Sequence, residues 1–394
     1  ICGAGIIGLT IAKALLKRGY EKITILEKEK SLGAHASGRN SGVLHAGIYY
    51  NTDSLKAQFC VKGNLQMRNY CKKHHLPVQE TGKVVVAKDE SELPVLHELF
   101  KRGEANGAKV ELIDEKQLKE IEPYAKTYKT ALYSPNTSVT DPKQVLECLR
   151  QELVASGKVA ILHQTAFLGL KTQTCAHTTS GNIPFHTFIN AAGAYSDKVA
   201  QAFGVESHYK LIPFKGTYKK LSSAKSHLVN GNIYPVPNIR NPFLGVHLTK
   251  GIDGQVYVGP TSIPAFSREN YGIFKGLTRE AFEILYREGV LFFKNDKFRR
   301  VALDEVRKYR ASHFFRGVKA LVKEIAPKDL EDSKKVGIRP QLVDWKKKEL
   351  VMDFLVERKE NSIHILNSIS PAFTCSMPFA EHVVDNYLPS LACC

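Results

Sequence analysis

Three glycines near the start of the chain have the spacing of a phosphate-binding turn. Gly3, Gly5 and Gly8 form a Gly-x-Gly-x-x-Gly motif directly before an apolar, alanine-rich run that ends at Gly19. In this motif the first glycine makes the tight turn after a strand, the second lets the backbone approach a pyrophosphate, and the third lets a helix pack closely on the sheet. The unpaired N–H groups at the helix N-terminus then face the phosphates. Because many turns contain glycine, the motif needs a second signal.

The second signal is an acidic residue at the end of the next predicted strand. Residues 22–26 are predicted to form this strand, and Glu27 follows it about 20 residues beyond Gly8, where dinucleotide-binding folds have a ribose-binding acid. A carboxylate there accepts hydrogen bonds from ribose hydroxyls and repels a 2′-phosphate. The sequence therefore predicts an ADP-ribose ligand of the FAD or NAD kind rather than NADP.

The segment after Glu27 distinguishes between these two ligands. Residues 28–50 are rich in Gly, Ser, Asn and His, and contain too much glycine for a regular helix. An NAD-binding unit would continue at once with another helix and strand, whereas flavoproteins have a loop pressed against the ligand between the ribose and the isoalloxazine. We therefore expect FAD as the cofactor. A mobile surface loop is the alternative interpretation of this segment.

The predicted elements that position these residues include both helices and strands. Residues 54–75 and 278–325 have helical composition, a helix begins at Asp141-Pro142, residues 83–87 form a buried strand, and residues 212–264 are β-like. We expect an α/β fold in which a discontinuous, Rossmann-like FAD-binding domain carries an inserted antiparallel-sheet substrate domain of α+β type. The FAD-binding domain is assigned residues 1–82, 141–215 and 333–394, and the substrate domain residues 83–140 and 216–332.

Composition and charge limit the possible functions. The 394 residues are enough for two domains, and no run of about 18 uncharged apolar residues is present that would span a membrane. Lys and Arg number 56 against 39 Asp and Glu, giving a net charge of +17. Such an excess suits nucleic acid, an anionic membrane surface or an anionic substrate, and is also found in lysine-rich proteomes.

The cysteines and the first residue bear on the cellular context. The eight cysteines lack paired metal-ligand spacing, so we expect reduced thiols and no metal site. The chain begins at Ile1, inside the first predicted strand. We therefore expect further residues to precede it, with any targeting signal among them.

Several longer segments have counterparts in a known family. The glycine motif and residues 26–30 are followed by residues 38–50, with the sequence Gly-Arg-Asn-Ser-Gly-Val-Leu-His-Ala-Gly-Ile-Tyr-Tyr. Further matching segments, in the expected order over almost the whole chain, are 231–237, 241–249, 265–271, 337–339 and 370–372. On these segments the chain resembles the L-2-hydroxyglutarate dehydrogenase family, which belongs to the D-amino-acid-oxidase-like group of FAD proteins.

The chain departs from the family pattern in two places. Lys215 stands where the family usually has Arg, and residues 136–138, Asn-Thr-Ser, stand where it has a His-Thr-Gly-like run. A guanidinium and an ammonium bind carboxylates differently. These departures would alter substrate affinity or mark a paralogue for a related 2-hydroxy acid, and they leave the cofactor unchanged.

The resemblance implies oxidation of L-2-hydroxyglutarate to 2-oxoglutarate, with FAD taking the hydride and a quinone or electron-carrier protein reoxidising the flavin. The small dicarboxylate substrate then needs a base for its hydroxyl proton and cations for its carboxylates. His247 and His45 are the candidate bases, with His247 preferred and a structural role as the alternative for His45. Arg339 is the candidate for the α-carboxylate. Lys215 and Arg240 are candidates for the distal carboxylate, with surface charge as their alternative role.

The resemblance also assigns the cofactor contacts, and other functions stay open beside it. The residues assigned to FAD are Gly3, Gly5, Gly8, Glu27, Ser41, Gly42, Gly193 and Ala372. An amine or amino-acid oxidase of the glycine or sarcosine oxidase type has the same fold. An RNA-associated flavoprotein is a further alternative, but the cations are dispersed and no RNA-binding module is recognisable, so we expect no nucleic-acid partner.

Residues 282–316 combine aromatic side chains with many cations. This pattern is typical of a solvated helical face, and it also suits peripheral contact with an anionic membrane that holds a quinone. We expect an intracellular location, either cytoplasmic, with peripheral contact at the inner membrane, or mitochondrial in a eukaryote.

Overall fold

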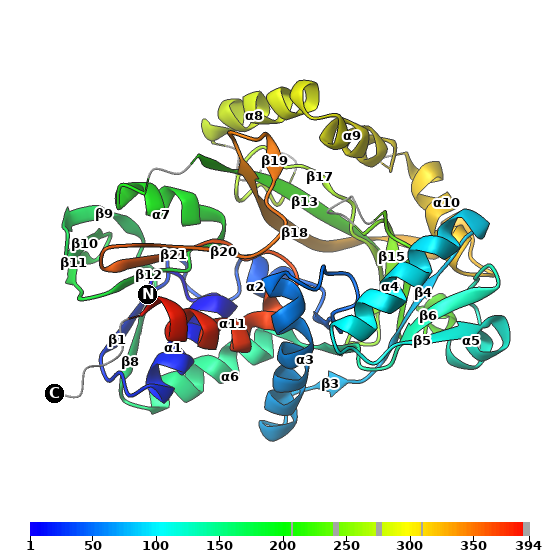
Figure 1. Cartoon of the computed structure of the whole chain (residues 1–394), viewed down its shortest axis with the longest axis horizontal. Helices are drawn as coiled ribbons and strands as arrows, with labels where there is room; N and C mark the ends of the chain where they lie inside the picture. Colours follow the sequence, from blue (N-terminus) through cyan, green and yellow to red (C-terminus); the bar gives the residue numbers. More distant parts are fainter. Residues whose placement is uncertain (206–207, 239–243, 273–277, 309, 389–394) are drawn as a thin grey trace. The chain divides into compact units, whose positions relative to one another are not determined.

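The chain divides into two compact units, and its computed structural model describes residues 1–205, 208–238, 244–272, 278–308 and 310–388. Unit 1 comprises Ile1–Asn40, Pro142–Pro213 and Arg339–Cys394, and unit 2 comprises Ser41–Asp141 and Phe214–Ile338. Strands β13 (Tyr209–Leu221) and β18 (Leu330–Asp344) each begin in one unit and end in the other. Figure 1 follows the chain through both.

Unit 1 contains a mainly parallel sheet. Its other elements are α1 (Ile6–Lys17), β1 (Ile23–Leu26), α2 (Ala36–Arg39), α6 (Pro142–Ala155), β8 (Val159–Leu162), β9 (Phe167–Thr172), β10 (Cys175–Thr178), β11 (Gly181–Pro184), β12 (Phe188–Asn190), η2 (Gly193–Tyr195), α7 (Ser196–Ala202), β19 (Glu349–Leu350), β20 (Leu355–Lys359), β21 (Ser362–Asn367) and α11 (Ala372–Tyr387). β1 pairs in parallel with β8, β12 pairs in parallel with β21, and β20 is antiparallel to β21.

Cys2 joins the two strand groups of this sheet. It makes a parallel bridge to Leu26 of β1 and another to Asn190 of β12. The tight turn into α1 follows at Gly3. Helix α1 packs against α11 and α6, as Figure 1 shows for the three helices.

Helix α7 and a separate antiparallel hairpin sheet, β11-β10-β9, also belong to unit 1. Phe203, which follows α7, packs with Phe188 of β12, Ala176 of β10 and Leu366 of β21 in one buried cluster. Parallel strands joined through helices are the arrangement of a Rossmann-like domain, so the predicted α/β fold is confirmed.

Unit 2 is organised around one long, mostly antiparallel sheet. Its elements are β2 (Val43–Leu44), α3 (Leu55–Lys73), β3 (Val78–Gln79), β4 (Lys83–Val86), η1 (Glu90–Glu92), α4 (Leu93–Ala105), β5 (Glu111–Asp114), α5 (Glu115–Ile121), β6 (Thr130–Ser134), β7 (Ser138–Thr140), η3 (Ser223–Leu228), β14 (Asn232–Pro235), β15 (His247–Lys250), β16 (Val256–Gly259), β17 (Ile263–Pro264), α8 (Glu280–Lys294), α9 (Asp296–Lys308), α10 (Ala311–Leu321) and η4 (Pro327–Asp329). The strand order is β19-β18-β13-β16-β15-β14-β4-β6-β5, and β17 pairs with β13. The β14–β4 pair is parallel, whereas β15, β16, β5 and β6 pair with their neighbours in antiparallel fashion.

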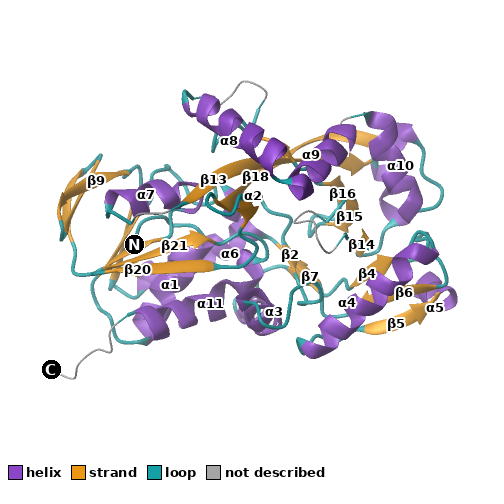
Figure 2. Ribbon diagram, turned by 45° about the horizontal axis from the view of Figure 1, so that its top comes forward, coloured by secondary structure: helices purple, strands orange, loops and turns teal. Residues whose placement is uncertain are grey.

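The two faces of this sheet carry different side chains, because successive residues of a strand point to opposite faces. Val84 and Ile233 lie on one face and pack with Val318 of α10. Val85 lies on the other face and packs with Leu96 of α4. Figure 2 shows α10 beside β14 and β15, and α4 beside β6.

Residues 41–82 belong to unit 2, although the sequence placed them in the FAD-binding domain. β2 pairs with β7, and the side-chain amide of Asn64 in α3 donates to the carbonyl oxygens of Leu44 and Asn136, each at 3.0 Å. These bonds connect the segment to the β6–β7 region. The other unit boundaries fall close to the predicted ones, and the assignment of FAD and substrate to separate domains stays a prediction.

The predicted helices are present, and the structure gives their bounds. Residues 54–75 form α3, which Ser54 caps by accepting the amide of Ala57, and α6 begins at Pro142. The helical segment 278–325 consists of three helices, α8, α9 and α10, in place of one. Within the described residues, no helix combines the length and the apolar character needed to cross a membrane.

Candidate active site

The glycine turn of unit 1 is closely surrounded by backbone. Gly3 has a φ of +106°, and a Cβ there would lie 2.5 Å from the carbonyl oxygen of Ala191. A Cβ on Gly8 would lie 1.9 Å from the carbonyl oxygen of Gly3, and one on Gly5 would lie 3.0 Å from Oγ of Ser37. A side chain at Gly3 or Gly8 is therefore excluded by fixed backbone atoms.

Helix α1 begins directly after this turn, and its N-terminus has features that favour a bound anion. Its N-cap, Gly5, provides no side-chain cap, and its first turn contains no acidic residue. Oγ of Ser37 accepts the amide of Ile6 at 3.0 Å. The positive end of the helix dipole and a close backbone approach are the two features that hold a diphosphate. The residues present therefore fit the diphosphate of FAD.

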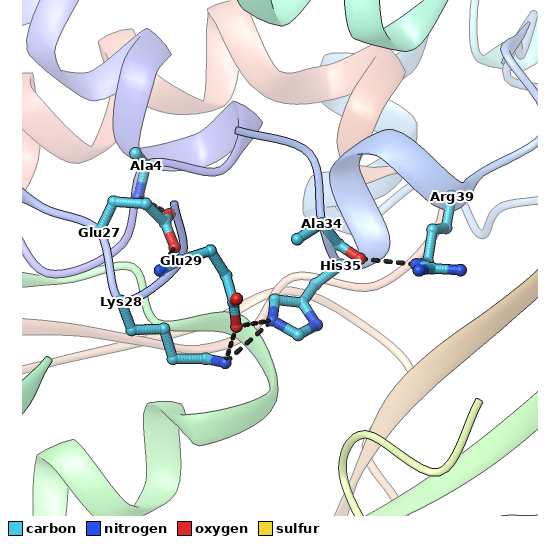
Figure 3. A network of polar contacts seen from close by, with 7 residues as sticks. All are labelled: Ala4, Glu27, Lys28, Glu29, Ala34, His35 and Arg39. Carbon is cyan, nitrogen blue, oxygen red and sulfur yellow. Dashed lines mark hydrogen bonds and ion pairs between the residues drawn. The ribbon is translucent and has the colours of Figure 1, made fainter. Parts of the chain in front are cut away.

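The Glu27 carboxylate is fixed beside the same turn (Figure 3). Its Oε2 accepts the amide of Ala4 at 3.1 Å, and its Oε1 accepts the amide of Glu29 at 2.9 Å. Each carboxylate oxygen has two acceptor sites, so both keep capacity for a further donor. A ribose hydroxyl is such a donor, and Glu27 therefore fits the role predicted for it.

A polar network follows Glu27 on the loop to α2 (Figure 3). The ammonium of Lys28 pairs with Glu29 Oε1, and Nε2 of His35 lies 2.9 Å from both Lys28 Nζ and Glu29 Oε1. Hydrogen bonds from Lys28 and then His35 lower the pKa of the Glu29 carboxyl. The glycine-rich segment also approaches its own backbone, because a Cβ on Gly38 would lie 2.2 Å from the Gly33 carbonyl oxygen.

A second group of polar residues lies on one face of the unit 2 sheet. Tyr234 of β14 pairs with Val85 of β4, and Lys83 shares the face of Val85 because it is two residues away. The antiparallel register Ile233 with Leu248 brings His247 of β15 beside Tyr234. Strand pairing therefore places Lys83, Tyr234 and His247 side by side.

The aromatic ring of Tyr234 contacts both neighbours. The His247 ring stacks on it with centroids 3.9 Å apart, and Lys83 Nζ lies 4.3 Å from its centroid. Lys83 Nζ also lies 5.3 Å from the ring centroid of Tyr49. Lys83 is 1% exposed, and among the described residues its ammonium has no hydrogen-bond partner. Such contacts with ring faces stabilise an ammonium only in part.

Burial determines the protonation of these groups. It lowers the pKa of His247 to about 4 and that of Lys83 to about 7, and it raises the pKa of Tyr234 to about 12. The pKa of His45 is well below its usual value, because of burial first and then the nearby charges of Lys83 and His247. Both imidazoles are therefore neutral at physiological pH, and Lys83 changes its charge there.

The predicted cofactor residues occupy both units. In unit 1, Gly193 follows the strand-end residues that crowd Gly3, and Ala372 is buried at the start of α11, with its amide donating to Ile369 O at 3.0 Å. In unit 2, Oγ of Ser41 accepts the amide of Val43 at 3.3 Å, and Gly42 has a φ of +79°. The contacts of these four residues with FAD stay predictions.

The predicted carboxylate-binding residues lie in different surroundings. Lys215 Nζ in β13 donates to Asn270 Oδ1 at 3.3 Å and to the Gly272 carbonyl oxygen at 2.9 Å, and burial lowers its pKa. Nε of Arg339 in β18 donates to Gln341 Oε1 at 3.3 Å. Arg240, the third candidate, lies outside the described residues.

The two histidines were predicted as site residues from the sequence, whereas Lys83 was not. The strand containing Lys83 was predicted as buried, and a lysine at the edge of an otherwise apolar strand was the available signal. Tyr49 and Tyr234 were noticed only as parts of matching segments. Their proximity to Lys83 depends on the pairing of β4 with β14, which the sequence alone does not determine.

Solved structures of two oxidases are similar to this chain over nearly its whole length. An L-α-glycerophosphate oxidase from Mycoplasma pneumoniae, solved with FAD bound, has a TM-score of 0.75 and 22% identity over 98% of this chain and 94% of that one. A glycine oxidase from Geobacillus kaustophilus has a TM-score of 0.70 and 18% identity over 98% of this chain and 92% of that one. These likenesses confirm the fold.

Sequence similarity is closer to one group of enzymes. The L-2-hydroxyglutarate dehydrogenase of Indibacter alkaliphilus is 36% identical over 98% of this chain and 97% of its own length. The mitochondrial L-2-hydroxyglutarate dehydrogenases of Nematostella vectensis and Homo sapiens are 36% and 33% identical over 98% of this chain and 89% and 87% of theirs.

A family model described as FAD dependent oxidoreductase matches residues 1–386. This match agrees with the glycine turn and with the fixed Glu27 carboxylate, so the predicted FAD dependence is confirmed. The chain therefore belongs to the FAD-dependent oxidoreductase family and, within it, to the family of the L-2-hydroxyglutarate dehydrogenases.

Proposed function

We propose that this chain oxidises L-2-hydroxyglutarate to 2-oxoglutarate. The observation that carries the proposal is a pair of neutral histidines, half-buried His45 and buried His247, in a chain that aligns with L-2-hydroxyglutarate dehydrogenases over nearly its whole length. Oxidation of a secondary alcohol needs a base for the hydroxyl proton, and a neutral imidazole is suited to accept it. Bound FAD supplies the two-electron acceptor for the carbon–hydrogen bond that breaks.

His247 is the preferred base because its tautomer is determined. Its Nδ1 lies 2.9 Å from the carbonyl oxygen of Gly245, which can only accept, so Nδ1 carries the proton. The lone pair of the neutral ring is therefore on Nε2. Stacking on Tyr234 fixes the plane of the ring. Nε2 of His247 would accept the hydroxyl proton of the substrate.

Lys215 is proposed to bind the distal carboxylate. Its ammonium donates to two neutral oxygens, from Asn270 and Gly272, and among the described residues it forms no ion pair. A half-buried cation without an acidic partner favours an anionic ligand. Arg339 is proposed for the α-carboxylate, because a guanidinium can bind a carboxylate through two hydrogen bonds.

The electron acceptor is proposed to be a quinone or a carrier protein that meets the chain at α8. This helix exposes Phe282, Tyr286 and Phe293, which are 79%, 67% and 76% exposed. Lys294 lies at the end of this helix, and α9, which packs against α8, carries five cations and three acids. Exposed aromatic rings with adjacent cations are typical of surfaces that rest on anionic lipid. We therefore propose peripheral membrane contact through α8.

The test is anaerobic mixing of the FAD-loaded protein with L-2-hydroxyglutarate, its D enantiomer and glycine, while the flavin absorbance is followed. Bleaching by the L enantiomer alone is expected. Bleaching by glycine, with no response to either hydroxy acid, would replace the proposal with an amine oxidase. Reoxidation by a soluble quinone analogue, with and without anionic vesicles, then tests the acceptor and the membrane contact.

A further inference from the structure

Lys83 is an ionisable side chain in an enclosed position. It is 1% exposed, and within the described parts of the chain its Nζ has neither a hydrogen bond nor an ion pair. A buried ammonium without a counter-ion has lost its hydration and gained no partner charge. The neutral amine is therefore favoured more than in water, and burial lowers the pKa of Lys83 to about 7.

Among the described residues, no carboxylate forms an ion pair with Lys83 or shifts its pKa. The ionisable groups that interact with Lys83 are Tyr234 of β14, His247 of β15, His45 and Tyr49 of the segment after β2, and Cys60 of α3. Cys60 is a thiol that donates to the His45 carbonyl oxygen at 3.4 Å. In the described structure, the groups that favour a charge on Lys83 are therefore the rings of Tyr234 and Tyr49 and the sulfur of Cys60.

A positive charge on Lys83 disfavours a positive charge on His247 or His45, and the reverse also holds. Positive charge on Lys83 lowers the pKa of His247 and of His45. A proton that His247 accepts while Lys83 is charged creates two like charges in a buried cluster, where little water screens them. When Lys83 is neutral, an imidazolium at His247 is the only charge in the cluster.

We propose, on the basis of the function proposed above, that Lys83 is a positioning residue whose release of a proton converts His247 from a weak base into a competent one. Lys83 first gives its proton to solvent, so the cluster changes from one positive charge to none. Nε2 of His247 would then take the hydroxyl proton of the substrate, and bound FAD would supply the acceptor for the hydride that leaves the α-carbon. The cluster again carries one positive charge, now on His247, and proton loss to solvent restores the neutral state.

Two substitutions with opposite expected effects test this role. Lys83→Met removes the charge, so flavin reduction by L-2-hydroxyglutarate should stay fast at pH values where the wild type slows. At pH 6 the variant should exceed the wild type by up to about tenfold, because a group with a pKa of about 7 is mostly protonated there. Lys83→Arg keeps the charge at every pH, so its rate should be low throughout.

Lys335→Met is the matched control. The Nζ of Lys335 also lies over a tyrosine, 4.1 Å from the ring centroid of Tyr257, and burial also lowers its pKa, but Asp253 and Asp141 act on it in the opposite direction. Its pH profile should equal that of the wild type. A loss of rate in Lys83→Met that is equal at all pH values, or a Lys83→Arg profile equal to the wild type, would overturn the proposal.

A measurement without turnover separates this inference from the proposed function. In protein labelled with ¹³C at lysine Cε, one resonance should titrate near pH 7 and be missing from the Lys83→Met spectrum. Absence of such a resonance in the wild type refutes the inference even if both variants fail to fold. If the wild-type flavin does not respond to L-2-hydroxyglutarate while this resonance titrates, the proposed function fails and the charge assignment to Lys83 stands.

Discussion

The imidazole of His247 and the phenol ring of Tyr234 lie nearly parallel, with an interplanar angle of 22°. Tyr234 is 2% exposed, and β14, which carries it, lies between the strands of Lys83 and His247. One ring thus touches both the proposed base and the residue that controls its charge. Changes at Tyr234 should therefore affect the chemistry of the cluster.

Tyr234→Leu should lower kcat/KM for L-2-hydroxyglutarate by roughly 2- to 10-fold, because an aromatic stack contributes about 0.5–1.5 kcal/mol beyond area burial. Tyr234→Phe keeps the stack and serves as its control. The two variants are compared by steady-state kinetics and thermal unfolding. Equal rates for both would show that the stack does not position His247.

Gly8→Ala should abolish FAD retention and lower the free energy of unfolding by about 1–3 kcal/mol, because its Cβ would meet the Gly3 carbonyl oxygen at 1.9 Å. Gly289→Ala is the control: Gly289 is also helical, and a Cβ there would meet nothing within 4 Å. That change should be neutral or stabilising by up to about 1 kcal/mol. Flavin absorbance after gel filtration and the thermal midpoint distinguish them.

Lys215→Met should raise KM for L-2-hydroxyglutarate by roughly 10- to 100-fold with a smaller change in kcat, since a hydrogen bond to a charged group contributes about 1.5–3 kcal/mol. L-2-hydroxypentanoate has the same carbon chain without the distal carboxylate, so its KM should not change. A parallel rise for both substrates would assign the distal carboxylate to another cation.

Acid should destabilise the protein partly through His364. This ring is fully buried, its Nε2 lies 2.9 Å from Ser362 Oγ, and its Nδ1 lies 3.2 Å from the side-chain amide nitrogen of Asn190. The amide must donate to Nδ1, so a second ring proton has no acceptor. Burial lowers the folded-state pKa to about 4, below the usual 6.5.

The unfolded state therefore binds the extra proton first as pH falls below 6.5, and stability is lost down to about pH 4. For His364 the loss should approach about 3 kcal/mol. His364→Gln should flatten this part of the pH dependence, whereas the exposed His177→Gln should leave it unchanged. Urea unfolding between pH 4 and pH 7.5 provides the measurement, and parallel curves for wild type and His364→Gln would contradict the prediction.

Local signals in the sequence were enough to predict the turn, helix and acidic residue that we propose to bind the nucleotide. Gly3, Gly8 and Glu27 lie in one strand–turn–helix–strand unit, whose geometry follows from their spacing. The capping box of α5 is equally local: its two hydrogen bonds join Asp114 and Gln117, three residues apart.

The cluster of Lys83, Tyr234 and His247 could not be predicted in the same way. Lys83, Tyr234 and His247 come together through a parallel pair and an antiparallel pair of strands that are distant in sequence. Pairing of this kind depends on tertiary packing. For the same reason the sequence did not indicate that residues 41–82 lie in one compact unit with β7, which is the partner strand of β2.

The register between β4 and β14 also protects the cluster against misassembly. A slip of one residue would turn every side chain of β4 to the other face of the sheet. Lys83 would then enter the largely aliphatic cluster that contains Val84 and Ile233. The register that buries the valines of β4 is thus the one that brings Lys83, Tyr234 and His247 together. Selection for a stable sheet therefore also maintains the arrangement of these ionisable groups.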